Sequence, residues 1–122
     1  YQGDELGEYG GGDPDNRRFM TFSGHSAAQD ALRTRLSKLI ALRRTYPALR
    51  RGARKQVWVD ADLYVYTMTL GSEQLVVALN RSDTDRTISV QDIPPGLTDL
   101  LSGESVSAGA MVLDARSARV MK

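Results

Sequence analysis

The run Leu75-Val76-Val77-Ala78-Leu79 is apolar at every position and has the length of one β-strand. Side chains along a strand point alternately to its two faces, so Val76 and Ala78 lie on one face and the other three residues on the opposite face. A sheet in a two-layer β-sandwich buries only one of its faces. We therefore expect this strand to be covered on one face by a second sheet and on the other by a helix, or by structure from outside this chain.

Short segments with strand character lie on both sides of this run. They are separated by turn residues such as Gly71-Ser72 and Pro94-Pro95-Gly96. The predicted strands cover residues 55–59, 63–70, 73–81, 86–90, 98–101, 110–114 and 118–121. Strands of this length and spacing are typical of an antiparallel β-sandwich, so the predicted fold class is mainly β with one long helix.

The helix is predicted over residues 26–46, where the apolar residues recur every three or four positions. The main positions of this apolar stripe are Leu32, Leu36, Leu39 and Ile40. Pro47 disfavours a helical conformation in the residue before it, so the amphipathic helix is predicted to end there.

The first 25 residues are rich in glycine and show no periodic pattern, which predicts a loop. Within this loop, Asp13-Pro14-Asp15-Asn16 is typical of a helix start, with Asp13 as the N-cap and Pro14 at the first helical position. We therefore expect about one turn of helix there.

Length and composition exclude several classes of protein. At 122 residues and 13.4 kDa the chain is too short for a complete (β/α)8-barrel, which needs about 250 residues. Its formal charge of +1 is too small for the phosphate field of a nucleic-acid binder. Without cysteine there is no thiolate metal site, and no apolar run approaches the roughly 20 residues that span a membrane. We expect no cofactor, no nucleic-acid partner and no membrane partner.

Four parts of the sequence, taken in order, carry a family resemblance. They are Tyr1-Gln2-Gly3-Asp4-Glu5-Leu6-Gly7; Gly10-Gly11-Gly12-Asp13-Pro14-Asp15-Asn16-Arg17-Arg18 followed by Met20; Leu39-Ile40-Ala41-Leu42-Arg43 with Pro47-Ala48-Leu49-Arg50-Arg51-Gly52; and Leu75-Val76-Val77-Ala78-Leu79-Asn80-Arg81-Ser82 with Leu113-Asp114-Ala115-Arg116-Ser117-Ala118-Arg119-Val120. In this order and spacing they resemble the α-amylase family of glycoside hydrolases, particularly its cyclomaltodextrinase and neopullulanase-like members.

This resemblance implies a fold and a function. Residues 1–52 would end a catalytic barrel, with a loop at 1–25, the last barrel helix at 26–46 and a connector at 47–52. Residues 53–122 would form the C-terminal β-sandwich domain. The parent would be a retaining hydrolase or transglycosylase acting on α-glucosidic linkages of starch-derived oligosaccharides. Its catalytic carboxylates would precede Tyr1, so this portion would be non-catalytic and would stabilise the barrel. The alternative is a free-standing β-sandwich module that binds carbohydrate or protein without catalysis.

Asp13 and Arg17 are the candidate substrate-binding residues. Side chains four residues apart share one face over a helical turn, so Asp13 can orient the Arg17 guanidinium toward sugar hydroxyls. The resemblance implies that this motif lies on the donor side of a cleft for an α-glucan or maltooligosaccharide. The alternative is a capped turn with a local ion pair and no ligand.

Other chemical roles fit the loop acids less well. A catalytic pair among Asp4, Glu5, Asp13 and Asp15 would need two carboxylates about 5 to 5.5 Å apart, whereas acids are common in polar loops and at helix starts. Calcium requires about six to eight oxygen ligands, and Asp13, Asp15 and Asn16 supply too few. We therefore predict no catalytic residue and no metal ligand in this chain.

His25, the only histidine, precedes the helix and is predicted to have a capping or surface role. The basic residues around the connector are Arg43, Arg44, Arg50, Arg51, Arg54 and Lys55. The net charge near zero and the few aromatic residues among them disfavour a nucleic-acid interface, so they are predicted to be solvated or paired with acids of the barrel implied by the resemblance. Trp58, Tyr64 and Tyr66 form either an aromatic platform for sugars or part of the core, with the two tyrosines on one strand face.

The apolar stripe of the helix predicts association. Burying each of its large side chains is worth roughly 1.5 to 3 kcal/mol, which favours covering the stripe. We expect either a homodimer through the exposed helix or a helix packed on the sheet face that carries Val76 and Ala78.

Overall fold

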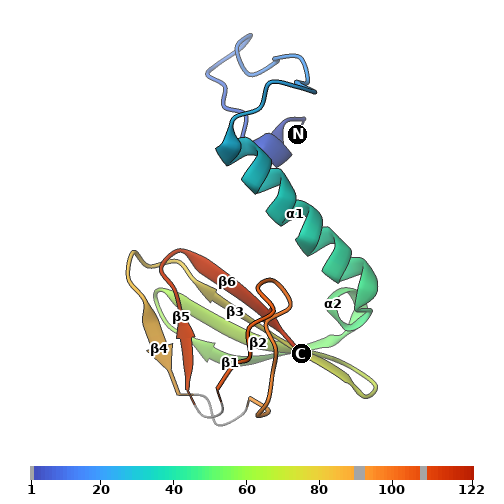
Figure 1. The fold of residues 1–122 in the computed structure, drawn as a ribbon, viewed down its shortest axis with the longest axis vertical. Coiled ribbons are helices and arrows are strands. Elements are labelled where there is room, and N and C mark those ends of the chain that lie inside the picture. Colours follow the sequence, from blue (N-terminus) through green and yellow to red (C-terminus); the bar gives the residue numbers. More distant parts are fainter. Residues whose placement is uncertain (1, 90–92, 108–109) are drawn as a thin grey trace. The chain divides into compact units, whose positions relative to one another are not determined.

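The structure, a computed structural model, describes residues 2–89, 93–107 and 110–122 (Figure 1). In chain order its elements are η1 (Asp4–Leu6), α1 (Ala27–Thr45), α2 (Ala48–Arg51), β1 (Ala53–Val59), β2 (Leu63–Leu70), β3 (Glu73–Asn80), β4 (Arg86–Ile88), β5 (Met111–Leu113) and β6 (Ser117–Met121). The chain forms two compact units, Tyr1–Ala41 and Leu42–Lys122. The predicted domain division after residue 52 remains a prediction. Within the described ranges, no helix combines the length and the apolar character needed to cross a membrane.

The second unit is a β-sandwich made of two antiparallel sheets (Figure 1). One sheet has four strands in the order β1-β2-β3-β6, and the other consists of β4 and β5. The core between them is a cluster of buried side chains, namely Leu63, Val65, Val76, Ala78, Ile88, Leu97, Met111, Leu113 and Met121. The predicted mainly-β sandwich fold is therefore confirmed.

Strand β3 is covered on both faces, as its apolar run predicts. Val76 and Ala78 point into the sandwich core, and Leu75 and Val77 are buried in a second cluster on the opposite face of the sheet. That second cluster also contains the end of α1 and α2, through Leu42, Tyr46, Ala48 and Leu49. The expectation that the helix covers the face with Val76 and Ala78 is wrong, because β4 and β5 occupy that face.

The connection from α1 to the sheet is fixed by polar contacts. The Ala48 N–H donates to Glu73 Oε2 at 2.7 Å, which ties the start of α2 to the start of β3. A Cβ atom on Gly52 would lie 2.5 Å from the carbonyl oxygen of Ala48, so only glycine fits at the end of α2. Arg50 Nη1 donates to the carbonyl of Arg43 at 2.8 Å and thereby satisfies an orphan carbonyl at the C-terminus of α1.

The predicted strand over residues 98–101 is wrong. Thr98 and Asp99 make isolated bridges only, to Ser105 and Met121. Asp99 as a residue is 3% exposed, and its carboxylate accepts hydrogen bonds from the Leu101 N–H and the Val120 N–H. Backbone bonds with residues 120–122 remain at Thr98 and Leu100, but the Val120 N–H donates to the Asp99 carboxylate, so isolated bridges form instead of a regular strand. The other predicted strands are present, with ends that differ by up to two residues where the chain is described; Val90 lies outside the described residues.

The helix α1 agrees with its predicted range of 26–46 to within one residue at each end. Ser26 begins it with a capping box: the Gln29 N–H donates to Ser26 Oγ at 3.3 Å, and the Ser26 N–H donates to Gln29 Oε1 at 2.9 Å. Its apolar stripe stays accessible, since Leu32 is 42% exposed and Ile40 is 51% exposed.

Candidate functional site

The loop with the candidate binding residues belongs to the first unit and is built from turns. The Asp15 N–H donates to the Gly12 carbonyl at 2.9 Å, and the Arg17 N–H donates to the Pro14 carbonyl at 3.0 Å. Both bonds span three residues, and the segment forms turns rather than the predicted helical turn with Asp13 as its N-cap. The correction has a local cause, because the carboxylate of Asp13 binds a side chain instead of capping backbone N–H groups.

The side chain that binds the Asp13 carboxylate is that of Arg17, so the predicted pairing of these two residues is confirmed. Arg17 Nε donates to Asp13 Oδ1 at 3.2 Å, and Nη2 donates to Oδ2 at 3.3 Å. Two parallel bonds fix the plane of the guanidinium against the plane of the carboxylate. The side chains of Arg17 and Asp13 are 69% and 62% exposed, so both remain accessible to a ligand.

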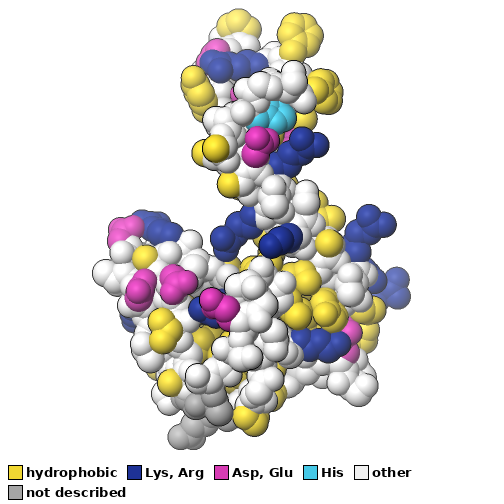
Figure 2. Space-filling model, viewed as in Figure 1, with side chains coloured by type: hydrophobic (Ala, Val, Ile, Leu, Met, Phe, Trp, Pro, Cys, Tyr) yellow, Lys and Arg dark blue, Asp and Glu magenta, His cyan; other side chains and the backbone are white. Residues whose placement is uncertain are grey.

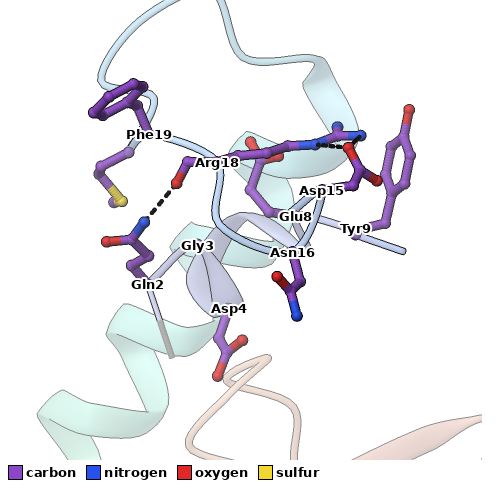
Figure 3. Close-up of a pocket in the computed structure, with 11 residues that line it drawn as sticks. Gln2, Gly3, Asp4, Glu8, Tyr9, Asp15, Asn16, Arg18 and Phe19 are labelled. Atoms are coloured by element: carbon purple, nitrogen blue, oxygen red, sulfur yellow. Dashed lines mark hydrogen bonds and ion pairs between the residues drawn. The ribbon is translucent and has the colours of Figure 1, made fainter. Parts of the chain in front are cut away.

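A second ion pair lies beside the first. Arg18 Nη2 donates to Asp15 Oδ1 at 2.8 Å, and the Gly11 N–H donates to Asp15 Oδ2 at 2.9 Å. The guanidinium of Arg18 also stacks on the ring of Tyr9, 4.8 Å from its centroid (Figure 3). The hydrogen bonds from Arg18 and Gly11 lower the pKa of Asp15, and the same pair raises the pKa of Arg18.

Sequence reasoning missed this second pair. The spacing of three residues between Asp15 and Arg18 is a signal that could have found it, since such side chains meet over one turn. The contribution of Tyr9 has no comparable signal, because Tyr9 and Arg18 are nine positions apart and meet only through the path of the loop.

The loop closes on itself at a glycine. A Cβ atom on Gly10 would lie 2.7 Å from the Asn16 Cα atom, so the two limbs of the loop approach too closely for any other residue. Next to this crossing is a cavity of about 190 Å³, whose lining includes Glu8, Tyr9 and Arg18 (Figure 3). Asp13 and Arg17 are not among its lining residues.

His25 is neither a cap nor a surface residue, in contrast to the prediction. Its side chain is 6% exposed, with Nδ1 3.3 Å from Asp30 Oδ1 and Nε2 3.1 Å from the Thr21 carbonyl oxygen. It thus links the loop to the first turn of α1, while Ser26 provides the cap. In the described parts of the chain, no group of three or more His, Cys, Asp or Glu side chains is arranged to hold a metal ion.

The aromatic residues of the sandwich have different environments. Tyr64 and Tyr66 lie on the same face of β2 with ring centroids 5.1 Å apart, as predicted, and both are half-buried. Burial raises the pKa of Tyr66. Trp58 on β1 is 41% exposed, and its Nε1–H donates to Asp60 Oδ2 at 3.1 Å. The alternative of an aromatic sugar platform therefore remains a prediction that concerns Trp58 more than the tyrosines.

Charged residues of the sandwich lie in mixed clusters. Figure 2 shows Asp and Glu side chains alongside Lys and Arg on this unit. Arg86 contacts both Asp60 and Asp62 at 3.4 Å, and Arg116 contacts Asp83 at 2.7 Å. These arginines are thus paired with acids.

Comparison with known proteins identifies relatives over most of the chain. No protein-family model matches it. It is 34% identical over 119 residues to a cyclomaltodextrin glucanotransferase of Geobacillus stearothermophilus, with 90% of this chain and 16% of that enzyme covered. A cyclomaltodextrinase of Geobacillus thermopakistaniensis is 36% identical over 117 residues, with 93% and 20% covered. The chain therefore spans at most a fifth of the length of these relatives.

Solved structures match the chain over nearly its full length. An α-amylase from Anoxybacillus has a TM-score of 0.84 and 30% identity, with 99% of this chain and 27% of that one covered. The α-amylase from Geobacillus thermoleovorans, solved with acarbose, has a TM-score of 0.85 and 28% identity, with 99% and 28% covered. The chain thus belongs to the α-amylase family of glycoside hydrolases and corresponds to the C-terminal part of these enzymes.

Proposed function

We propose that the chain is the non-catalytic C-terminal portion of a retaining enzyme that hydrolyses or transfers α-glucosidic linkages of starch-derived oligosaccharides. In this proposal residues 1–52 complete the catalytic barrel and residues 53–122 form the β-sandwich domain that stabilises it. The relatives named as cyclomaltodextrin glucanotransferase and cyclomaltodextrinase support this substrate class. The acarbose complex of the Geobacillus thermoleovorans enzyme supports it as well.

The observation that carries the proposal is the bidentate Asp13–Arg17 pair on an exposed loop. A guanidinium held in one plane by a carboxylate presents its remaining N–H edge in a fixed direction, which suits hydroxyl groups of a sugar. Loops that follow barrel strands are the usual place for such contacts in barrel enzymes. Asp13 and Arg17 are therefore proposed to bind the substrate and to take no part in the chemical steps.

Catalysis is assigned to residues outside this chain. A retaining mechanism needs one carboxylate as nucleophile and another as acid and base. Both carboxylate oxygens of Asp13 are bonded to Arg17, and the hydrogen bonds from Arg18 and Gly11 lower the pKa of Asp15, which disfavours Asp15 as a proton-donating acid. The 122-residue chain alone is therefore proposed to be inactive toward maltooligosaccharides, cyclodextrins and pullulan.

The test is Arg17→Ala in the enzyme that carries this segment. Losing charge-assisted hydrogen bonds worth about 1.5 to 3 kcal/mol lowers kcat/KM for a maltooligosaccharide about 10- to 100-fold, with an unchanged melting temperature. Arg116→Ala is the matched control, because it removes an exposed arginine that pairs with Asp83 on the sandwich. Equal kcat/KM values for Arg17→Ala and Arg116→Ala would contradict the proposal.

For the 122-residue chain by itself, in which no barrel covers the apolar stripe of α1, a homodimer through α1 is a second part of the proposal. The stripe that includes Leu36 and Leu39, each 36% exposed, is the surface that supports it. Sedimentation velocity of the wild-type chain and of Leu36→Lys measures it: the dimer is expected for the wild type and lost in the variant. A wild type that stays monomeric at all concentrations would remove this part of the proposal.

A further inference from the structure

The two bonds between Asp13 and Arg17 fix the guanidinium relative to the carboxylate, but they do not fix the direction of the pair relative to the rest of the loop. Both side chains are more than half exposed, and an exposed ion pair four residues apart contributes little to local order. If the guanidinium of Arg17 is to meet a substrate in one orientation, the backbone on either side of it must be held by other contacts.

Asp15 supplies such contacts on both sides. Its Oδ2 accepts the N–H of Gly11 at 2.9 Å, and its Oδ1 accepts Nη2 and Nε of Arg18 at 2.8 and 3.2 Å. Gly11 precedes Asp13 in the chain, and Arg18 follows Arg17. One carboxylate thus joins the two limbs of the loop and encloses the Asp13–Arg17 pair between them.

Arg18 is held in turn from two directions. Its guanidinium lies over the ring of Tyr9 at 4.8 Å, and the side-chain amide of Gln2 donates to its backbone carbonyl (Figure 3). The close crossing of Gly10 and Asn16 brings these parts within reach. Adjacent residues therefore have different tasks, since Arg18 binds within the loop while Arg17 remains accessible.

We propose that Asp15 and Arg18 are positioning residues, which hold the loop so that Asp13 and Arg17 present a fixed hydrogen-bonding edge to an oligosaccharide. This inference rests on the proposed function of Asp13 and Arg17. Asp15 and Arg18 act through the loop backbone and through Asp13 and Arg17, which make the contacts with the sugar.

The hydrogen bonds that Asp15 accepts from Gly11 and Arg18, called the brace below, require its ionised form. A carboxylate accepts hydrogen bonds at both oxygens, whereas asparagine has one accepting oxygen and cannot serve Gly11 and Arg18 in the same way. Hydrogen bonds from Arg18 and Gly11 lower the pKa of Asp15, so the ionised form persists to lower pH than that of an ordinary aspartate.

Steady-state kinetics of the enzyme that carries this segment test the inference on a maltooligosaccharide of defined length. Asp15→Ala is expected to raise KM about 5- to 10-fold while kcat changes less than about twofold, because the binding contact is misplaced and the reacting groups are intact. Asp83→Ala is the matched control, since it also removes an aspartate paired with an arginine, on the sandwich.

The double variant Asp15→Ala/Arg17→Ala separates positioning from stability. If Asp15 acts through Arg17, the KM of the double variant is expected to equal that of Arg17→Ala within about twofold. Arg18→Lys keeps the charge and is expected to give a KM between those of the wild type and Arg18→Ala. If Arg17→Ala raises KM but Asp15→Ala does not, or if the two effects multiply, the inference is overturned and the proposed function stands.

A measurement on the 122-residue chain tests the brace without any activity. The Gly11 amide is expected to lose protection against hydrogen exchange in Asp15→Ala and to keep it in Asp83→Ala. If Arg17→Ala leaves KM unchanged while the Gly11 amide responds as expected, the brace exists and the proposed function is the part that fails. If the Gly11 amide is unprotected in the wild type, the inference fails whatever the kinetics show.

Discussion

The loop-and-helix unit and the sandwich unit are held together by different forces. Among the described residues, Leu6 is the one apolar side chain of Tyr1–Ala41 that is fully buried, whereas Leu42–Lys122 contains two clusters of buried apolar side chains. The loop is ordered instead by ion pairs and turn hydrogen bonds, such as those of Asp13 and Asp15. Burial thus stabilises one unit, while polar contacts position side chains in the other.

The largest predicted effect is the loss of unfolding free energy when a side chain of the sandwich core is truncated. Leu113→Ala removes a side chain with 0% exposure from the sandwich and is expected to cost about 2 to 5 kcal/mol of unfolding free energy. Leu36→Ala, at 36% exposure on α1, is expected to cost less than about 1 kcal/mol. Urea unfolding measures both, with the fluorescence of Trp58, the only tryptophan, reporting on the sandwich and far-ultraviolet circular dichroism reporting on α1. Similar losses for the two variants would remove the distinction between the units.

An intermediate effect is expected at a buried polar residue of the sandwich. Asn80 is 3% exposed; its Nδ2 lies 2.9 Å from the Thr84 carbonyl oxygen, and its Oδ1 accepts the Ser82 N–H at 3.0 Å. Asn80 Nδ2 also donates to the Leu113 carbonyl at 3.1 Å in a buried bond, so Asn80→Ala removes a buried donor and is expected to cost about 1 to 3 kcal/mol. Asn16→Ala on the exposed loop is the matched control and is expected to leave the thermal midpoint unchanged. A midpoint that falls equally in both variants would contradict the prediction.

The smallest predicted effect is a dependence of the unfolding free energy on pH. Backbone N–H groups of Asp62 and Leu63 and the indole N–H of Trp58 lower the pKa of Asp60 in the folded chain. A lowered folded pKa contributes stability above the unfolded value, and this stability is lost as the pH falls through the folded value. Between pH 5 and pH 2, about where aspartates titrate, the wild type should lose more stability than Asp60→Asn. Parallel curves for the two proteins would show that Asp60 makes no such contribution.

Local sequence patterns predicted the elements well where the determining contacts are also local. The helix end follows from Pro47 alone, and the two-faced run around Val76 and Val77 predicts a strand covered on both sides. Part of the site is predictable for the same reason, because Asp13 and Arg17 are four positions apart. Asp15 with Arg18 carries a comparable spacing, but the stacking of Arg18 on Tyr9 depends on the path of the whole loop.

Contacts between distant residues determined the remaining features. The helix end packs on the face with Leu75 and Val77 because β4 and β5 already cover Val76 and Ala78, and no periodicity in β3 distinguishes the two faces. Asp99 breaks a segment with strand composition because its carboxylate reaches the Val120 N–H, 21 positions away. The hydrophobic pattern of a sequence indicates which side chains avoid water, because that preference is a property of each side chain by itself. Which partner covers each side chain is set by packing and hydrogen bonding across the folded chain, and these exist only once distant segments meet.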